Sequence, residues 1–226
     1  MLPCFIYNSQ RHCSWRIHME RGNTKKAILE AALELFSRQG FEATSISQIA
    51  DAVGIRKASL YSHFDSKQAI LDALVKEVLE EYEKHSLFSR ANWEKDGGLL
   101  PLSPDEAVTM IQGQIRYILH DKAISRARKM LVIEQFQNKE LAKLQTKQNY
   151  SDVLRYFTSF IECLIEKGVL DSDDPEIMAA QFCLPISIWI NLADREPERE
   201  SEVMEMVEKH IRQFFKVYGK ERTDKQ

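Results

Sequence analysis

The chain has 226 residues, 44% of them hydrophobic, with 31 Lys and Arg against 34 Asp and Glu, for a net charge of −3. This length suffices for one large or two small domains with a buried core, and no run approaches the ~18 consecutive apolar residues of a membrane helix. The charge balance argues against a protein that binds nucleic acid over its whole surface, so any surface that binds nucleic acid must be a local cluster of positive charge.

The four cysteines (Cys4, Cys13, Cys163 and Cys183) lie far apart in the sequence. Scattered cysteines in a chain of this size indicate reduced thiols and not a disulfide framework. Residues 1–22 also lack an apolar region of signal-peptide length. We therefore expect a cytoplasmic protein without membrane association.

Residues 1–22 show no helical periodicity, and we expect a flexible N-terminal extension there. Cys4, His12, Cys13 and His18 are conceivable metal ligands, but their spacing does not match the paired ligands of a zinc finger. We expect neither a metal nor a cofactor.

The first predicted helix runs from about Thr24 to Gln39 and is followed by Gly40. Its apolar residues recur at intervals of three and four, which defines one buried face; they are Ile28, Ala32, Leu35 and Phe36. Phe41 is expected to fill the core beside this helix.

A pair of short helices follows. Ser45 and Gln48 have the spacing of a capping box, and Gly54 favours a left-handed turn that ends this helix. A second helix, predicted over 56–64, turns Leu60 inward and leaves its polar residues outward. Two short helices joined by a glycine turn are typical of a helix-turn-helix, whose second helix fits the major groove of DNA.

The stretch from Ile28 to Leu71 resembles the DNA-binding domain of TetR-type (tetracycline-repressor-like) regulators. The resemblance lies in the helix and turn ILEAALELFSRQGFEATSISQIADAVGI, in the string Leu60-Tyr61-Ser62-His63-Phe64, and in Ser66-Lys67. Two residues depart from the pattern: Arg56 stands where such proteins often have a capping Ser, and Ala58 where many have Gly.

Arg56, Lys57 and Ser59 carry groups that can bind base edges or phosphates, and Ala58 could touch a thymine methyl group. The resemblance adds phosphate contacts by Thr44, Tyr61, His63 and Lys67. Ser45 completes the expected DNA-binding set.

The next helix is expected to start at Asp65 or Ser66, where Asp65 and Gln68 have capping-box spacing, and to run towards His85. The segment Asn92–Glu106 contains two Gly and two Pro, which predicts a loop.

The rest of the chain predicts further helices. Ser103-Pro104 and Asp174-Pro175 are helix starts; the other expected spans are 124–136, 139–167 and 198–218, and Pro185 predicts a kink. The fold class is therefore all-α, with about nine helices. We expect the helix-turn-helix domain at 23–70 and a helical effector-binding and dimerisation domain at 71–226.

The last two helices expose more apolar surface than a small domain hides, so we expect them to pack against a second copy. The predicted interface comprises Phe182, Ile186, Ile188, Trp189, Leu192, Val207, Ile211 and Phe214. The resemblance implies an effector cavity in the C-terminal domain. Its candidate lining, large or polar residues near apolar faces, comprises Met110, Gln114, Tyr117, Arg128, Glu134, Phe136, Tyr150 and Trp189; a filled core is the alternative.

Enzymatic sites are not indicated, because the sequence has no G-x-S-x-G elbow, no H-E-x-x-H pair and no phosphate-binding glycine loop. The prediction is a homodimeric repressor that binds a near-palindromic double-stranded DNA operator and is released by a small-molecule effector. A helical protein-interaction module that no longer reads DNA is the alternative.

Overall fold

The computed structural model describes residues 24–85 and 101–220. Regular structure within these ranges is helical, apart from an isolated antiparallel bridge between Leu170 and Gly219. The all-α prediction is therefore confirmed. The predicted extension 1–22, with its candidate metal ligands, and most of the predicted loop Asn92–Glu106 lie outside the described residues.

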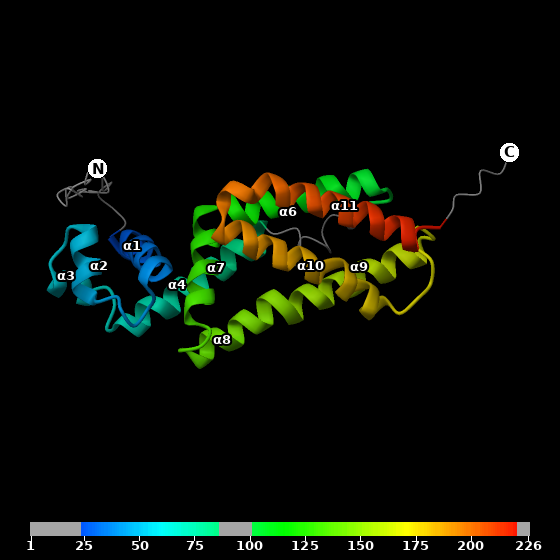
Figure 1. Ribbon diagram of the computed structural model, residues 1–226. Coiled ribbons are helices and arrows are strands. Elements are labelled where there is room, and N and C mark those ends of the chain that lie inside the picture. Colours follow the sequence, from blue (N-terminus) through cyan, green and yellow to red (C-terminus); the bar gives the residue numbers. More distant parts are fainter. Residues whose placement is uncertain (1–23, 86–100, 221–226) are drawn as a thin grey trace, which may run out of the picture.

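The N-terminal part, here called the head, contains α1 (Thr24–Gln39), α2 (Ile46–Val53) and α3 (Lys57–Tyr61). Helix α4 (Lys67–His85) runs from the head to the helical body (Figure 1). The body comprises α6 (Pro104–His120), α7 (Lys122–Glu134), α8 (Lys139–Thr146), the π-helical turn η1 (Lys147–Ser151), α9 (Asp152–Glu166), α10 (Pro175–Arg195), the 3-10 turn η2 (Pro197–Arg199) and α11 (Glu200–Tyr218).

Local sequence signals explain the helix ends of the head. Ser45 and Gln48 form the predicted capping box, and Gly54 closes α2 with φ 77°. Helix α3 is shorter than predicted, because the backbone N–H groups of both His63 and Phe64 bond to the carbonyl of Leu60 and the chain turns there.

The start of α4 corrects one capping prediction. The hydroxyl of Ser66 accepts from the backbone N–H of Ala69 at 3.0 Å, so Ser66 caps the helix. The side chain of Gln68 instead donates to Asp72 at 2.8 Å. The predicted capping box of Asp65 and Gln68 is therefore wrong.

In the body, the predicted caps Ser103 and Asp174 are confirmed, since each accepts from backbone N–H groups of the first turn. Helix α7 ends at Glu134, before Phe136. The long helix predicted over 139–167 is interrupted by η1, whose wider turn is a feature often found at functional sites.

The buried side chains form two cores. One lies inside the body and includes Phe160, Phe182 and Ile211. The other fills the head and continues into α7 through Met130 and Leu131. The head therefore shares its core with a body helix, which ties the position of the head to that of α7.

Helices α10 and α11 pack inward more fully than the sequence suggested. Five residues of the predicted dimer interface are buried in the core of their own protomer, so this part of the prediction is wrong; they are Phe182, Ile186, Val207, Ile211 and Phe214. Trp189 and Leu192 are half-buried, and Ile188 is 65% exposed. Of the eight predicted interface residues, Ile188, Trp189 and Leu192 are the ones left with exposed surface for a second copy.

Helix α10 is the one helix in the described residues that could cross a membrane by length and composition. Its Met178, Phe182 and Cys183 are buried in the body core. A core helix passes the same test, so α10 is weak evidence for a membrane span.

Candidate nucleic-acid interface and internal cavity

The exposed face of α3 carries the groups that could meet nucleic acid. Leu60 is fully buried and anchors the helix in the head core. Side chains around it on α3 and the following turn are exposed, namely Arg56, Lys57, Ala58, Ser59, Tyr61 and His63. Arg56 makes no side-chain cap hydrogen bond, so its guanidinium is not used to hold the helix start.

Thr44 does not belong to this face. Its side chain is 1% exposed, and its hydroxyl donates to the carbonyl oxygen of Gly40 at 2.7 Å. Gln39 donates to the same hydroxyl at 3.1 Å. Thr44 therefore holds the turn between α1 and α2, and the predicted phosphate contact by its side chain is wrong. Ser45 is exposed, but its hydroxyl caps α2.

Lys67 is half-buried and linked to the same turn. Its Nζ donates to the carbonyl oxygen of Phe41 at 2.6 Å and lies 4.2 Å from the centre of the Phe41 ring. Lys67 thus has a structural partner, and any contact with a phosphate would use its remaining donor capacity.

Polar contacts join α7 to the head. Glu134 is 2% exposed, and its Oε1 accepts from the backbone N–H of Phe41 at 2.7 Å. Arg126 forms an ion pair with Glu34 of α1. Glu134 was predicted to line a ligand cavity, but it instead lies at the junction between the head and the body.

A cavity of about 140 Å³ lies in the body and is lined by residues of α4, α6, α7, α8 with η1, α9 and α10. Its walls are mostly apolar, and α4 contributes Val78 and Tyr82. The polar lining consists of Arg128, Gln145, Gln148, Asn149, Ser187 and Asn191. Such an apolar space with a few grouped polar side chains is typical of a small-molecule site.

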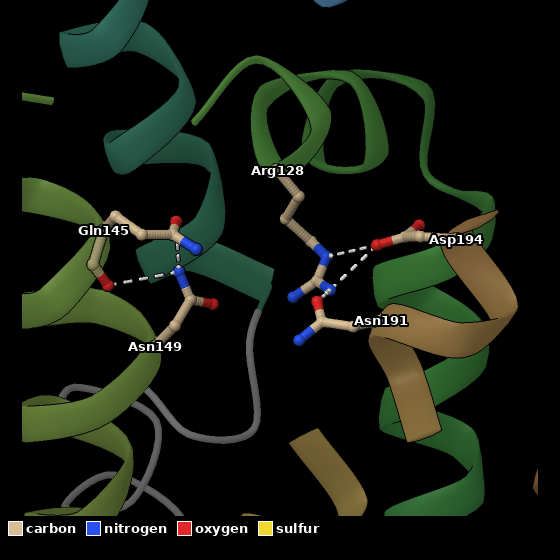
Figure 2. A network of polar contacts seen from close by, with 5 residues as sticks. All are labelled: Arg128, Gln145, Asn149, Asn191 and Asp194. Carbon is tan, nitrogen blue, oxygen red and sulfur yellow. Dashed lines mark hydrogen bonds and ion pairs between the residues drawn. The ribbon is translucent and has the colours of Figure 1, made fainter. Parts of the chain in front are cut away.

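The polar groups of the cavity come from α7, α8, η1 and α10 (Figure 2). Arg128 of α7 pairs with Asp194 of α10 at 2.9 Å and donates to Oδ1 of Asn191 at 3.3 Å. Across from them, Asn149 in η1 donates to Oε1 of Gln145 at 2.8 Å. The π-helical turn therefore coincides with the stretch of the long helix that lines the cavity.

Of the predicted cavity residues, the structure places Arg128 in the cavity wall. Gln114 is buried elsewhere in α6, whereas Phe136 and Tyr150 are 90% and 52% exposed. Met110, Tyr117 and Trp189 pack against the body core. Sequence reasoning missed Gln145, Asn149 and Asn191, because short amides in amphipathic helices look like ordinary surface residues.

Cys183 lies in the cavity wall, and burial raises the pKa of its thiol to about 11. The thiol is therefore neutral near pH 7. Both cysteines in the described residues, Cys163 and Cys183, are free thiols. In the same ranges, His, Cys, Asp and Glu side chains form no group of three or more that could hold a metal ion.

Two family models match the chain. The model described as "Bacterial regulatory proteins, tetR family" matches residues 28–74, which contain the helix-turn-helix. The model described as "AefR-like transcriptional repressor, C-terminal domain" matches residues 107–220, which include most of the cavity lining.

The curated relatives resemble the head. The negative transcriptional regulator IcaR of the biofilm operon icaADBC in Staphylococcus aureus is 48% identical over 52 residues, which are 23% of this chain and 28% of the relative. The chain thus spans less than a third of that relative's length.

Solved structures resemble most of the chain. A TetR-family regulator from Mesorhizobium loti has a TM-score of 0.62 at 18% identity, covering 88% of this chain and 98% of that one, and shares the fold. The flavonoid-responsive regulator FrrA has a TM-score of 0.58 at 25% identity, covering 88% of this chain and 99% of that one.

Proposed function

Because the chain belongs to the TetR family of bacterial regulatory proteins, we propose that it is a transcriptional repressor that binds operator DNA through α2 and α3. The observation that carries the proposal is the exposed cationic start of α3, where Arg56 and Lys57 are held outward by the burial of Leu60. Such a helix fits the major groove, where Arg and Lys donate to the O6 and N7 atoms of guanine.

The DNA contacts are divided between base edges and phosphates. Arg56, Lys57 and Ser59 supply donors for base edges, and Ala58 allows close approach of the helix. Tyr61 and His63, exposed beside them, supply phosphate contacts that fix the register. The functional division into a head at 23–70 and an effector-binding and dimerisation part at 71–226 follows from this assignment.

The repressor acts as a homodimer on a near-palindromic site, because two recognition helices must reach the major groove about 34–36 Å apart. Ile188, Trp189 and Leu192 of α10 form the apolar surface that a second copy would cover. A two-fold axis places the same patch on both sides of the interface.

A small molecule in the body cavity releases the operator. Val78 and Tyr82 place α4 in the cavity wall, and Arg128 and Leu131 do the same for α7. Both helices also contact the head, α4 through Leu71 and Leu74 and α7 through Glu134. A ligand can change DNA affinity only if it binds one position of these helices more tightly than the other. The size of that difference in ligand affinity limits the change in DNA affinity.

TetR-family regulators are non-enzymatic transcription factors, which agrees with the expected absence of an enzymatic site. We place the protein in the cytoplasm, where its DNA lies. FrrA is a flavonoid-responsive regulator by name, and this supports a response to small organic molecules here. A helical interaction module without sequence-specific DNA binding is the competing function.

An electrophoretic shift assay with genomic fragments at two salt concentrations separates the two functions. The repressor binds a small subset of fragments, and its affinity falls steeply with salt because each phosphate contact releases counterions. The Arg56→Ala/Lys57→Ala double variant should lose the selection among fragments. Absence of any selected fragment for the wild-type protein would favour the interaction module.

A further inference from the structure

At the polar end of the cavity, one hydrogen-bond donor of Arg128 has no acceptor among the residues that the structure describes. The Nε and Nη2 atoms of Arg128 donate to Oδ2 of Asp194 at 3.3 and 2.9 Å, and Nη2 also reaches Asn191. Nη1 has no hydrogen-bond acceptor within the described residues. In Figure 2, one guanidinium nitrogen points away from α10, towards Gln145 and Asn149. A ligand oxygen at this position would meet a donor that is not used by residues 24–85 or 101–220.

The charge at this end of the cavity is already balanced. Arg128 and Asp194 are 17% and 12% exposed at their side chains and neutralise each other. An anion would approach the carboxylate of Asp194, and a cation would approach the guanidinium. Either ion would also lose its hydration against apolar walls, which is unfavourable. The neutral thiol of Cys183 adds no compensating charge. The site therefore selects against charged ligands.

The size of the cavity limits the ligand further. Its volume is about 140 Å³, and a cavity of about 150 Å³ lined by Leu, Ile and Phe binds benzene. The walls here are of the same kind, with Ile111, Ile115 and Phe157 among them. The apolar body of a ligand is then about one aromatic ring.

We propose that the effector is a compact, uncharged, mostly apolar molecule of about one substituted aromatic ring, with an oxygen acceptor that binds Nη1 of Arg128. The regulatory meaning of this ligand rests on the proposed function as a repressor. Gln145, Asn149 and Asn191 carry amide N–H groups in the same cavity wall that can donate to this oxygen.

Three probes of similar size test this ligand class on the full-length protein. They are acetophenone, which is uncharged and carries a carbonyl oxygen, ethylbenzene, which lacks the oxygen, and benzoate, which is an anion. Calorimetry or ligand-observed NMR should show acetophenone binding about two- to tenfold more tightly than ethylbenzene, which is the value of one hydrogen bond. We expect acetophenone to bind more tightly even though the transfer of ethylbenzene from water into an apolar cavity is the more favourable of the two. Benzoate should bind more weakly than acetophenone.

Two variants locate the binding. Arg128→Lys keeps the charge opposite Asp194 but removes the free guanidinium nitrogen, so it should abolish the preference for acetophenone and leave ethylbenzene affinity within about twofold. Retained ethylbenzene binding also shows that this variant is folded. Arg155→Lys is the control, because Arg155 is exposed and lies in an ion pair with Asp152 outside the cavity lining; it should change nothing.

Equal or tighter binding of benzoate, no binding of acetophenone, or an unchanged preference in Arg128→Lys would each overturn the proposal. DNA binding is measured separately, without probes. If the wild-type protein selected no DNA fragment, the repressor function would be contradicted but the proposed ligand class would be unaffected. The probe results test the ligand class alone.

Discussion

Lys57 and Lys67 carry the same charge but have different surroundings. Lys57 is exposed at the first position of α3, whereas Lys67 is half-buried and donates to the carbonyl of Phe41 at 2.6 Å. A side chain without a structural partner is free to read DNA, while one that holds a turn acts through the shape of the head. The two lysines should therefore respond differently to removal.

We expect Lys57→Ala to weaken operator binding by about 1–3 kcal/mol and to relax specificity at one base pair. Lys67→Ala should weaken binding to operator and random DNA alike. It should also lower the midpoint of thermal unfolding, because the turn between α1 and α2 loses the hydrogen bond from Nζ of Lys67 to the carbonyl oxygen of Phe41. Fluorescence anisotropy on both DNAs, together with a thermal melt, checks this pair. Equal losses on both DNAs for Lys57→Ala would refute its role as a base reader.

At the level of elements, the turn between α1 and α2 is fixed by α7. Gly40 has φ 85°, and a Cβ there would lie 2.8 Å from Oε1 of Glu134. That oxygen accepts from the buried N–H of Phe41, so it cannot move aside without leaving the N–H unpaired. Gly54 has φ 77°, but a Cβ there meets nothing within 4 Å.

Gly40→Ala and Gly54→Ala therefore form a matched pair. In both variants, the alanine must adopt a left-handed backbone conformation, which lowers the free energy of unfolding by roughly 1–2 kcal/mol. Gly40→Ala should lower it further, because the added Cβ also displaces Glu134. Urea denaturation measures both free energies of unfolding. In a Glu134→Ala background the difference between the two glycine variants should shrink. An undiminished difference would show that Glu134 does not cause it.

Local signals predicted several helix starts correctly, whereas features that depend on tertiary packing were predicted poorly. Ser45, Ser103 and Asp174 act within one turn of their own helix, so their capping roles could be read directly from the sequence. The π-helical turn Lys147–Ser151 has no such signal. The apolar residues of 175–195 showed a buried helix, but periodicity cannot distinguish burial in the protomer from burial against a second copy.

The cavity in the structure shares only Arg128 with the eight residues predicted to line an effector cavity. A cavity exists where side chains from several helices leave space, which depends on how the helices are placed and not on the character of one residue. Arg128 could be predicted because a cation among apolar residues needs a buried partner. Asp194, its partner, lies 66 residues away, and no local spacing connects the two.

At the scale of the whole molecule, the assembly depends on the exposed part of α10. Ile188→Glu places a charge on a side chain that is 65% exposed in the protomer, so it should leave the protomer folded and yield monomers with weaker operator binding. Phe136→Glu is the control, because Phe136 is 90% exposed beyond the end of α7. Ile211→Glu would instead unfold the protein, since Ile211 is fully buried.

Analytical ultracentrifugation distinguishes these outcomes. Wild type and Phe136→Glu should sediment as dimers and Ile188→Glu as a folded monomer with unchanged circular dichroism. A dimer of normal stability for Ile188→Glu would exclude this surface of α10 from the interface.

In the proposed function, the head and the cavity form one switch, because α4 and α7 contribute residues to both. Coupling between two binding sites is reciprocal, so a ligand that weakens operator binding must itself bind the operator complex more weakly by the same factor. A complete reversal of the operator-bound population would need a preference of about 5.5 kcal/mol.

The most direct test is calorimetry of a cavity ligand with the free dimer and with the dimer saturated by operator DNA. The ligand is recognised as a cavity ligand by its loss of binding in Ser187→Phe, which adds a large side chain to the cavity wall. We predict a dissociation constant at least tenfold higher, or about 1.4 kcal/mol weaker binding, for the operator complex. The same dissociation constant with and without operator would contradict the account.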